Sequence, residues 1–233
     1  MSERRVFING EGKYTFKSPS AYESKWCFLT DKNRLRIIGQ KLSYIEFHRW
    51  LFANLRHKNL VEGSLDLAID FDIETGFIQT DILLIGSICE AALYSQIRSQ
   101  FDVEGDNAPS AVKNCFQKEE NKIERLSAKK VFIEGIDQSF EVVLLRKKTV
   151  SIPEYSISFA SLARAALEIG LIDSECFSQI DKLRKDRNTI HIGEESKRQD
   201  DQRFVFSMSD REEALATMAC LREQLRSNLI LAF

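Results

Sequence analysis

Prolines, histidines and closely spaced cysteines are scarce in this chain of 233 residues. The three prolines, Pro19, Pro109 and Pro153, lie far apart, and the sequence contains neither an internal repeat nor a low-complexity tract. Nothing therefore marks a flexible linker between domains. Since 43% of the residues are hydrophobic and 10% are aromatic, the chain can bury a sizeable core. We expect a single globular domain that spans residues 1–233.

The cysteines are too dispersed to suggest a crosslinked or metal-binding protein. They are odd in number and far apart: Cys27, Cys89, Cys115, Cys176 and Cys220. No two of them form a C-x-x-C pair, and no histidine stands at the spacing of a metal ligand. This pattern disfavours a disulfide framework and a zinc site, and it suits a reducing compartment. We therefore predict a cytoplasmic protein that uses no metal and no other cofactor.

Excess charge and long apolar segments are missing as well. The formal net charge is −2, so the chain lacks the basic character that by itself suggests a strong, nonspecific nucleic-acid binder. Any contact with RNA must then be local. The N-terminal segment MSERRVFINGEGKYTFKS has no apolar targeting region, and the apolar runs are much shorter than a membrane span. We expect no association with a membrane.

Residues 32–58 combine helical periodicity with a one-sided charge. Apolar residues recur there at roughly helical intervals, which predicts a long amphipathic helix. Its basic residues face a single acid, Glu46. The basic face around Arg49, Arg56 and Lys58 suits an RNA backbone, with a neighbouring aromatic ring stacking on a base. The alternative is a solvated basic face whose aromatic neighbours belong to the core.

An apolar helix is predicted in the middle of the chain. The acidic, glycine-containing residues 62–76 predict a loop. After them, TDILLIGSICEAALYSQIRSQF predicts a central helix that begins with Thr80 or Asp81 as its N-cap. Another helix is predicted from Ser110 to about Ala128.

The remaining segments complete a mainly helical fold. Residues 1–31 predict an N-terminal arm, and residues from about 130 to 152 predict a β-hairpin insertion that packs on the helices. A helix over 158–169 and a second one between Asp173 and Gly193 predict an αα-hairpin. A final helix follows at about 210–229. The expected fold class is therefore mainly α, a helical bundle with a small β-hairpin appendage.

Of the three histidines, two receive no chemical role. His48 and His57 lie nine residues apart and thus on different helix faces, which favours ordinary structural or surface positions. The third, His191, belongs to LRKDRNTIHIG. On a helix, Arg184, Arg187 and His191 fall within an arc of about 60°, beside the apolar stripe made by Phe177, Ile180, Leu183 and Ile190. Asn188 lies next to this face, which we expect to line a groove or an interface.

Glu90 supplies an independent reason for that face to be enclosed. It interrupts an otherwise apolar helix, and a buried carboxylate is costly unless it is paired with a cation. We predict that Glu90 contacts Arg184 or Arg187. The alternatives are a partly exposed Glu90 bound to a local donor, and a charged helix end without chemistry at residues 183–193.

The hairpin FASLARAALEIGLIDSECFSQIDKLRKDRNTIHIG and the helix DILLIGSICEAALYSQI resemble the HEPN-domain superfamily, helical proteins that include many prokaryotic toxin and defence ribonucleases. In that superfamily an arginine, usually followed by a polar residue, precedes a histidine by four to six intervening residues. Six residues separate Arg184 from His191, whereas Arg187-Asn188 supplies the arginine and polar pair with three residues before His191. Either arginine therefore fits one part of the pattern.

The resemblance implies a metal-independent endoribonuclease that acts in toxin-antitoxin or antiphage-defence biology. His191 would assist attack of the RNA 2′-hydroxyl on the adjacent phosphate, and an arginine would stabilise the developing charge. The products would carry 2′,3′-cyclic phosphate and 5′-hydroxyl ends. The site would lie at a homodimer interface, and an antitoxin or another defence protein is a possible partner. The alternative is a non-catalytic module of the same fold that dimerises or binds a nucleotide or a protein partner.

Overall fold

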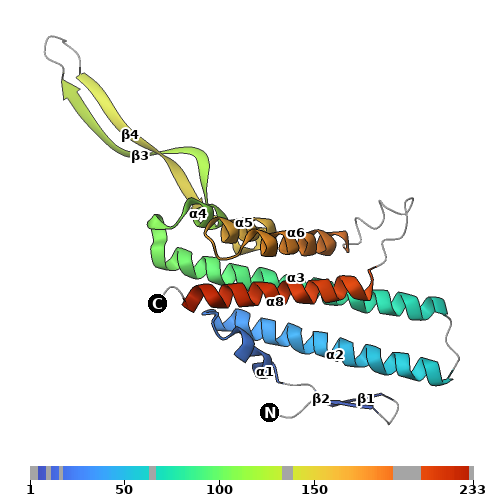
Figure 1. The fold of residues 1–233 in the computed structure, drawn as a ribbon. Coiled ribbons are helices and arrows are strands. Elements are labelled where there is room, and N and C mark those ends of the chain that lie inside the picture. The colour runs from blue at the N-terminus through green and yellow to red at the C-terminus, as the bar shows by residue number, and fades with distance from the viewer. Residues whose placement is uncertain are drawn as a thin grey trace.

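The computed structural model describes residues 5–8, 12–15, 18–62, 67–132, 139–190 and 206–230. They form a helical bundle with two small antiparallel sheets (Figure 1). The expected fold class, mainly α with a β-hairpin, is confirmed.

Two long helices lie side by side along the bundle, α2 (Lys32–Glu62) and α3 (Leu67–Glu104) (Figure 1). Helix α2 confirms the helix predicted over residues 32–58 and continues to Glu62. Helix α3 begins earlier than predicted, and most of the loop expected at residues 62–76 belongs to it. Gly76 disfavours a helix by only about 1 kcal/mol relative to alanine, which is too little to end one that packs along its length. Asp81 is consequently an interior residue of α3 and not its N-cap.

Helix α3 is the centre of the bundle, in contact with α2, α4, α5, α6 and α8. Its buried apolar residues face several neighbours: Ile78, Ile82, Ile85, Ile88, Cys89, Ala92, Leu93 and Ile97. Among the described residues, one segment is long and apolar enough to cross a membrane, Glu74–Asn107, and half of its most apolar window is buried inside the protein. Isolated polar residues such as Ser87 and Glu90 break this segment into the short runs seen in the sequence.

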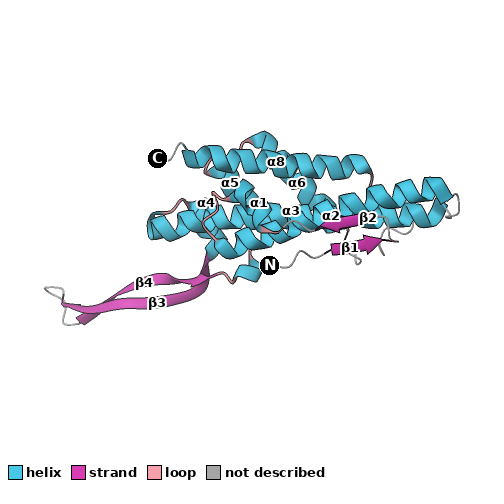
Figure 2. Cartoon of the chain, turned by 90° about the horizontal axis from the view of Figure 1, so that it is seen from below, coloured by secondary structure: helices cyan, strands magenta, loops and turns pink. Residues whose placement is uncertain are grey.

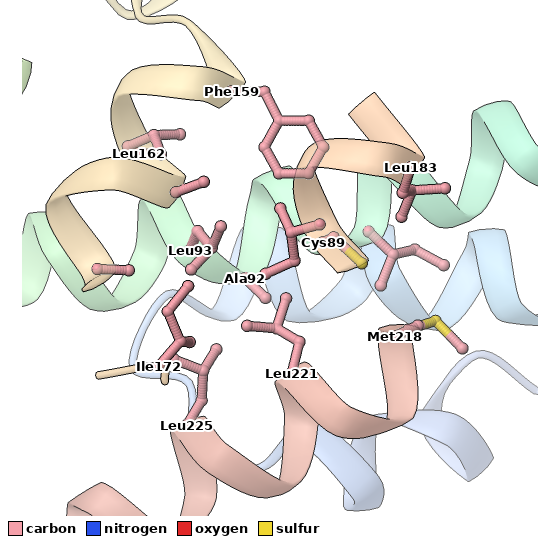
Figure 3. Close-up of a cluster of buried hydrophobic side chains, with 14 of the residues drawn as sticks. Cys89, Ala92, Leu93, Phe159, Leu162, Ile172, Leu183, Met218, Leu221 and Leu225 are labelled. Carbon is pink, nitrogen blue, oxygen red and sulfur yellow. The ribbon is translucent and has the colours of Figure 1, made fainter. Parts of the chain in front are cut away.

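The αα-hairpin and the last helix complete the core. Helix α5 (Phe159–Glu168) is capped by Ser158, whose Oγ accepts a hydrogen bond from the Ser161 amide at 3.0 Å. Helix α6 (Ser174–Thr189) is capped in the same way by Asp173, and Gly170 between them has a φ of +73°. Both predicted starts are confirmed. Figure 3 shows how α3, α5, α6 and α8 (Met208–Ile230) bring their apolar side chains together.

The long β-hairpin differs most from its prediction. Helix α4 (Ser110–Phe116) ends where β3 (Gln117–Phe132) begins, so the helix predicted to about Ala128 is wrong beyond Phe116. Strand β3 pairs with β4 (Ser139–Ser151), and the pairing outweighs the local helical spacing. The hairpin also projects away from the bundle, whereas packing on the helices was expected (Figures 1 and 2).

The described parts of the predicted N-terminal arm contain short elements. Strands β1 (Arg5–Ile8) and β2 (Gly12–Thr15) pair with each other, and α1 (Ser20–Glu23) leads into a 3-10 turn (Ser24–Trp26). Trp26 is buried at 1% exposure, which anchors this end of the chain to the core.

Candidate functional site

An ion pair joins α3 to α6 at the place where the sequence predicts chemistry. The Arg187 Nη1 donates a hydrogen bond to the Glu90 Oε2 at 2.5 Å. The predicted contact between Glu90 and a motif arginine is thereby confirmed. The two side chains are 25% and 30% exposed, so the pair lies at the edge of the bundle and solvent can reach it. An arginine at this depth is held in place and still accessible.

A glycine makes room for the arginine. Gly86 lies one helical turn before Glu90 on α3, and a Cβ at Gly86 would come within 3.0 Å of the Arg187 Cδ. The aliphatic part of Arg187 therefore crosses α3 at Gly86, and its guanidinium continues to Glu90. No local pattern in the sequence indicates this contact, because Gly86 and Arg187 are distant in the chain.

Lys41 of α2 adds a second cation near the pair. Burial lowers the pKa of Lys41, the charge of Arg187 lowers it further, and Glu90 opposes both effects. Three helices thus bring two cations and one carboxylate within electrostatic range. The sum is one excess positive charge, which favours an anionic ligand.

Arg184 lies in a different environment from Arg187. Its Nε and Nη2 donate to the Asp181 Oδ1 at 3.0 and 2.7 Å, both within α6. Lys185 also pairs with Asp181, and the two cations hold the pKa of that carboxyl below its usual value. The pairing of Arg184 is local, whereas that of Arg187 crosses the helix interface.

The other predicted site residues divide between described and undescribed positions. Asn188 is exposed next to Arg187, and Arg49 is exposed on α2. Helix α6 ends at Thr189 with Ile190 as its C-cap, so His191 and Gly193 lie outside the described residues. The side chains of Arg56 and Lys58 are also outside the described part, although their backbone belongs to α2.

A second polar cluster lies on another part of α3. The Asp81 side chain, 1% exposed, pairs with the His48 Nδ1 at 2.8 Å, and Arg211 of α8 donates its Nε to Asp81 at 2.5 Å. Asp81 was one of two candidates for the predicted helix cap, with Thr80, and Arg211 received no role from the sequence. Like Glu90, Asp81 is a carboxylate in an apolar helix, and such a group needs a cationic partner.

A small hollow opens beside this cluster. Its volume is about 280 Å³ when the adjoining space open to solvent is included. It is lined by His48, Arg49, Phe77, Ile78, Asp81, Met208 and Arg211. Within the part of the chain that the structure describes, no group of three or more His, Cys, Asp or Glu side chains could hold a metal ion.

Comparison of the chain with protein-family models, curated proteins and solved structures finds no match. Functional assignment therefore depends on the residues themselves.

Proposed function

We propose that this protein is a metal-independent endoribonuclease of the HEPN type, a toxin or antiphage-defence enzyme that works in the cytoplasm. The observation that carries the proposal is the Glu90–Arg187 ion pair between α3 and α6. In this proposal Arg187 and His191 are the catalytic residues, Asn188 contacts the RNA, and Glu90 is a positioning residue.

The state of Arg187 suits a phosphate ligand. A guanidinium carries five N–H donors, and Glu90 is bonded to the Nη1 group, which leaves other donors for phosphate oxygens. Because Glu90 and Gly86 fix the path of the side chain, less conformational entropy is lost when RNA binds. Lys41 adds positive potential at the same place. Arg184 is the weaker candidate, since its guanidinium is paired with Asp181.

The reaction is an internal transfer at phosphorus. His191 takes the proton of the RNA 2′-hydroxyl, and the oxygen attacks the adjacent phosphate while the bond to the 5′-oxygen breaks. Arg187 stabilises the charge on the phosphate oxygens in the transition state. One product carries a 2′,3′-cyclic phosphate, and the 5′-oxygen leaves as a hydroxyl after it takes a proton from water. His191 then returns its own proton to the solvent.

A homodimer is the proposed state of the enzyme. Ile37 and Tyr44 are 42% and 55% exposed on α2, and they stand four residues before and three residues after Lys41. These spacings place all three side chains on one helix face. Two large apolar side chains therefore flank a residue that adjoins the Arg187 pair, and a second subunit would cover them. An antitoxin or a defence partner that competes for this face would inhibit the enzyme.

Incubation with mixed RNA in a chelator tests the proposal. The wild-type protein should cleave, His191→Ala should not, and the matched control His57→Ala should cleave like the wild type. Equal cleavage by wild type and His191→Ala, or no cleavage by either, would rule out the proposed enzyme. A dimer that binds RNA or nucleotides without cleaving would point to the non-catalytic module of the same fold.

A further inference from the structure

The hollow beside His48 is separate from the proposed ribonuclease site. Its polar walls come from α2, α3 and α8, whereas the Glu90–Arg187 pair joins α3 to α6. Asp81 and Glu90 are nine residues apart on α3, which separates them by about 13 Å along the helix axis. The two groups therefore lie at different positions along the bundle.

His48 is held with one ring nitrogen available. An ionised carboxylate only accepts hydrogen bonds, so the pairing with Asp81 puts the proton on Nδ1. The Nε2 atom remains for another partner. It accepts from a hydroxyl when the ring is neutral and donates when the ring is protonated. The side chain is 15% exposed and lines the hollow, so a small ligand can reach it.

The charges around the hollow do not balance. Arg49 and Arg211 carry two positive charges against the single negative charge of Asp81. Arg211 is 7% exposed, and its Nη2 has no hydrogen-bond partner among the described residues. A buried guanidinium nitrogen without an acceptor is costly, so an acceptor oxygen at this place would stabilise the protein.

We propose that the hollow binds a phosphate group. In the complex, one phosphate oxygen accepts from the Arg211 Nη2, another contacts the His48 Nε2, and the exposed Arg49 guanidinium closes over the remaining oxygens. Guanidinium groups are suited to phosphate because several donors converge on one tetrahedral anion, while the His48 Nε2 accepts from a protonated phosphate oxygen or, in the protonated ring, donates to an ionised one. The hollow is partly open to solvent, so a phosphate group can approach it from outside. The apolar walls at Phe77, Ile78 and Met208 exclude water from its inner end.

Imidazole NMR tests this binding directly, because the chain has only three histidines. Titration with inorganic phosphate should shift the His48 ring signals in a saturable manner, with the signals assigned from the His48→Gln spectrum. The same shift should persist in His191→Ala, which separates this site from the proposed ribonuclease centre. A His48 signal that does not move with phosphate would overturn the proposal.

Matched arginine variants locate the anion. Arg211→Gln and Arg49→Gln should each weaken phosphate binding, by about tenfold or more for Arg211. Arg164→Gln on α5 is the control, since Arg164 is exposed away from the lining residues, and its affinity should equal that of the wild type. If Arg211→Gln does not fold, the exposed Arg49 decides the outcome. Equal affinities in wild type and Arg49→Gln would then contradict the site.

A parallel titration with a nucleoside 5′-monophosphate identifies the source of the phosphate. Tighter binding than inorganic phosphate would indicate a phosphate ester, and equal or weaker binding would indicate the free ion. Either result supports a phosphate site if it depends on Arg49, and binding of both probes without that dependence would refute it.

Discussion

Replacing Asp81 by asparagine should destabilise the bundle more than any surface charge change. Asp81 is 1% exposed and bridges two cationic or potentially cationic partners, His48 of α2 and Arg211 of α8. The substituted amide would keep the size of the side chain and remove its charge. An amide has one acceptor oxygen, so it cannot accept from both partners through separate oxygens as the carboxylate does. Arg211, with its side chain 8% exposed, would then be a buried charge without a counterion.

The cost follows from the burial of this pair. Removing one partner of a buried ion pair destabilises a protein by about 3–5 kcal/mol. For a domain of this size each kcal/mol lowers the melting temperature by about 2–4 °C, so a drop on the order of 10 °C is expected. Asp102 provides a matched control on the same helix, because its pair with Arg98 has side chains that are 53% and 42% exposed. Asp102→Asn should cost less than about 1 kcal/mol.

Urea unfolding followed by circular dichroism measures both variants in one assay. The free energy of unfolding of Asp81→Asn should fall by several times the change in Asp102→Asn. Losses within about 0.5 kcal/mol of each other would refute the argument that Asp81 holds α2, α3 and α8 together through a buried charge.

Three further changes have definite outcomes. Gly86→Ala should lower the RNA cleavage rate, because the new Cβ would displace the Arg187 side chain. The free energy of unfolding in urea should change by less than about 1 kcal/mol, because alanine favours the helix. An unchanged cleavage rate would argue against the observed path of Arg187. Asp173→Ala should lower that unfolding free energy by about 1 kcal/mol through loss of the α6 cap, and no loss would contradict the cap. With a thiol reagent at pH 8, the exposed Cys27 should react first, and the buried Cys89 and Cys176 last, since burial raises the pKa of both thiols. Fast labelling of either buried cysteine would show that the core opens.

Local signals in the sequence were enough to predict the αα-hairpin and one of its contacts. Ser158 and Asp173 are capping residues whose side chains bond to backbone amides within three positions, so their effect is encoded nearby. The Glu90–Arg187 contact followed from the cost of an unpaired carboxylate in an apolar helix.

Features that depend on distant pairing were missed. Residues 117–128 have apolar spacing compatible with a helix, and only their register with β4 makes them a strand. The contribution of Lys41 depends on how α2 lies against α3 and α6. Asp81 looked like a cap because the start of α3 was placed too late, and one of its two partners, Arg211, lies 130 residues further along the chain.

The central claim is that Arg187, held by Glu90, is the arginine of an RNA-cleaving site. A single-turnover cleavage assay on labelled RNA, in the presence of a chelator, should compare the wild type with Arg187→Gln and Arg184→Gln. Both variants replace an arginine of α6 by glutamine, so each is a control for the other. We expect a rate about 100-fold or more lower for Arg187→Gln and nearly unchanged for Arg184→Gln, with 2′,3′-cyclic phosphate ends on the wild-type product. Equal rates for wild type and Arg187→Gln, or a loss confined to Arg184→Gln, would contradict the claim.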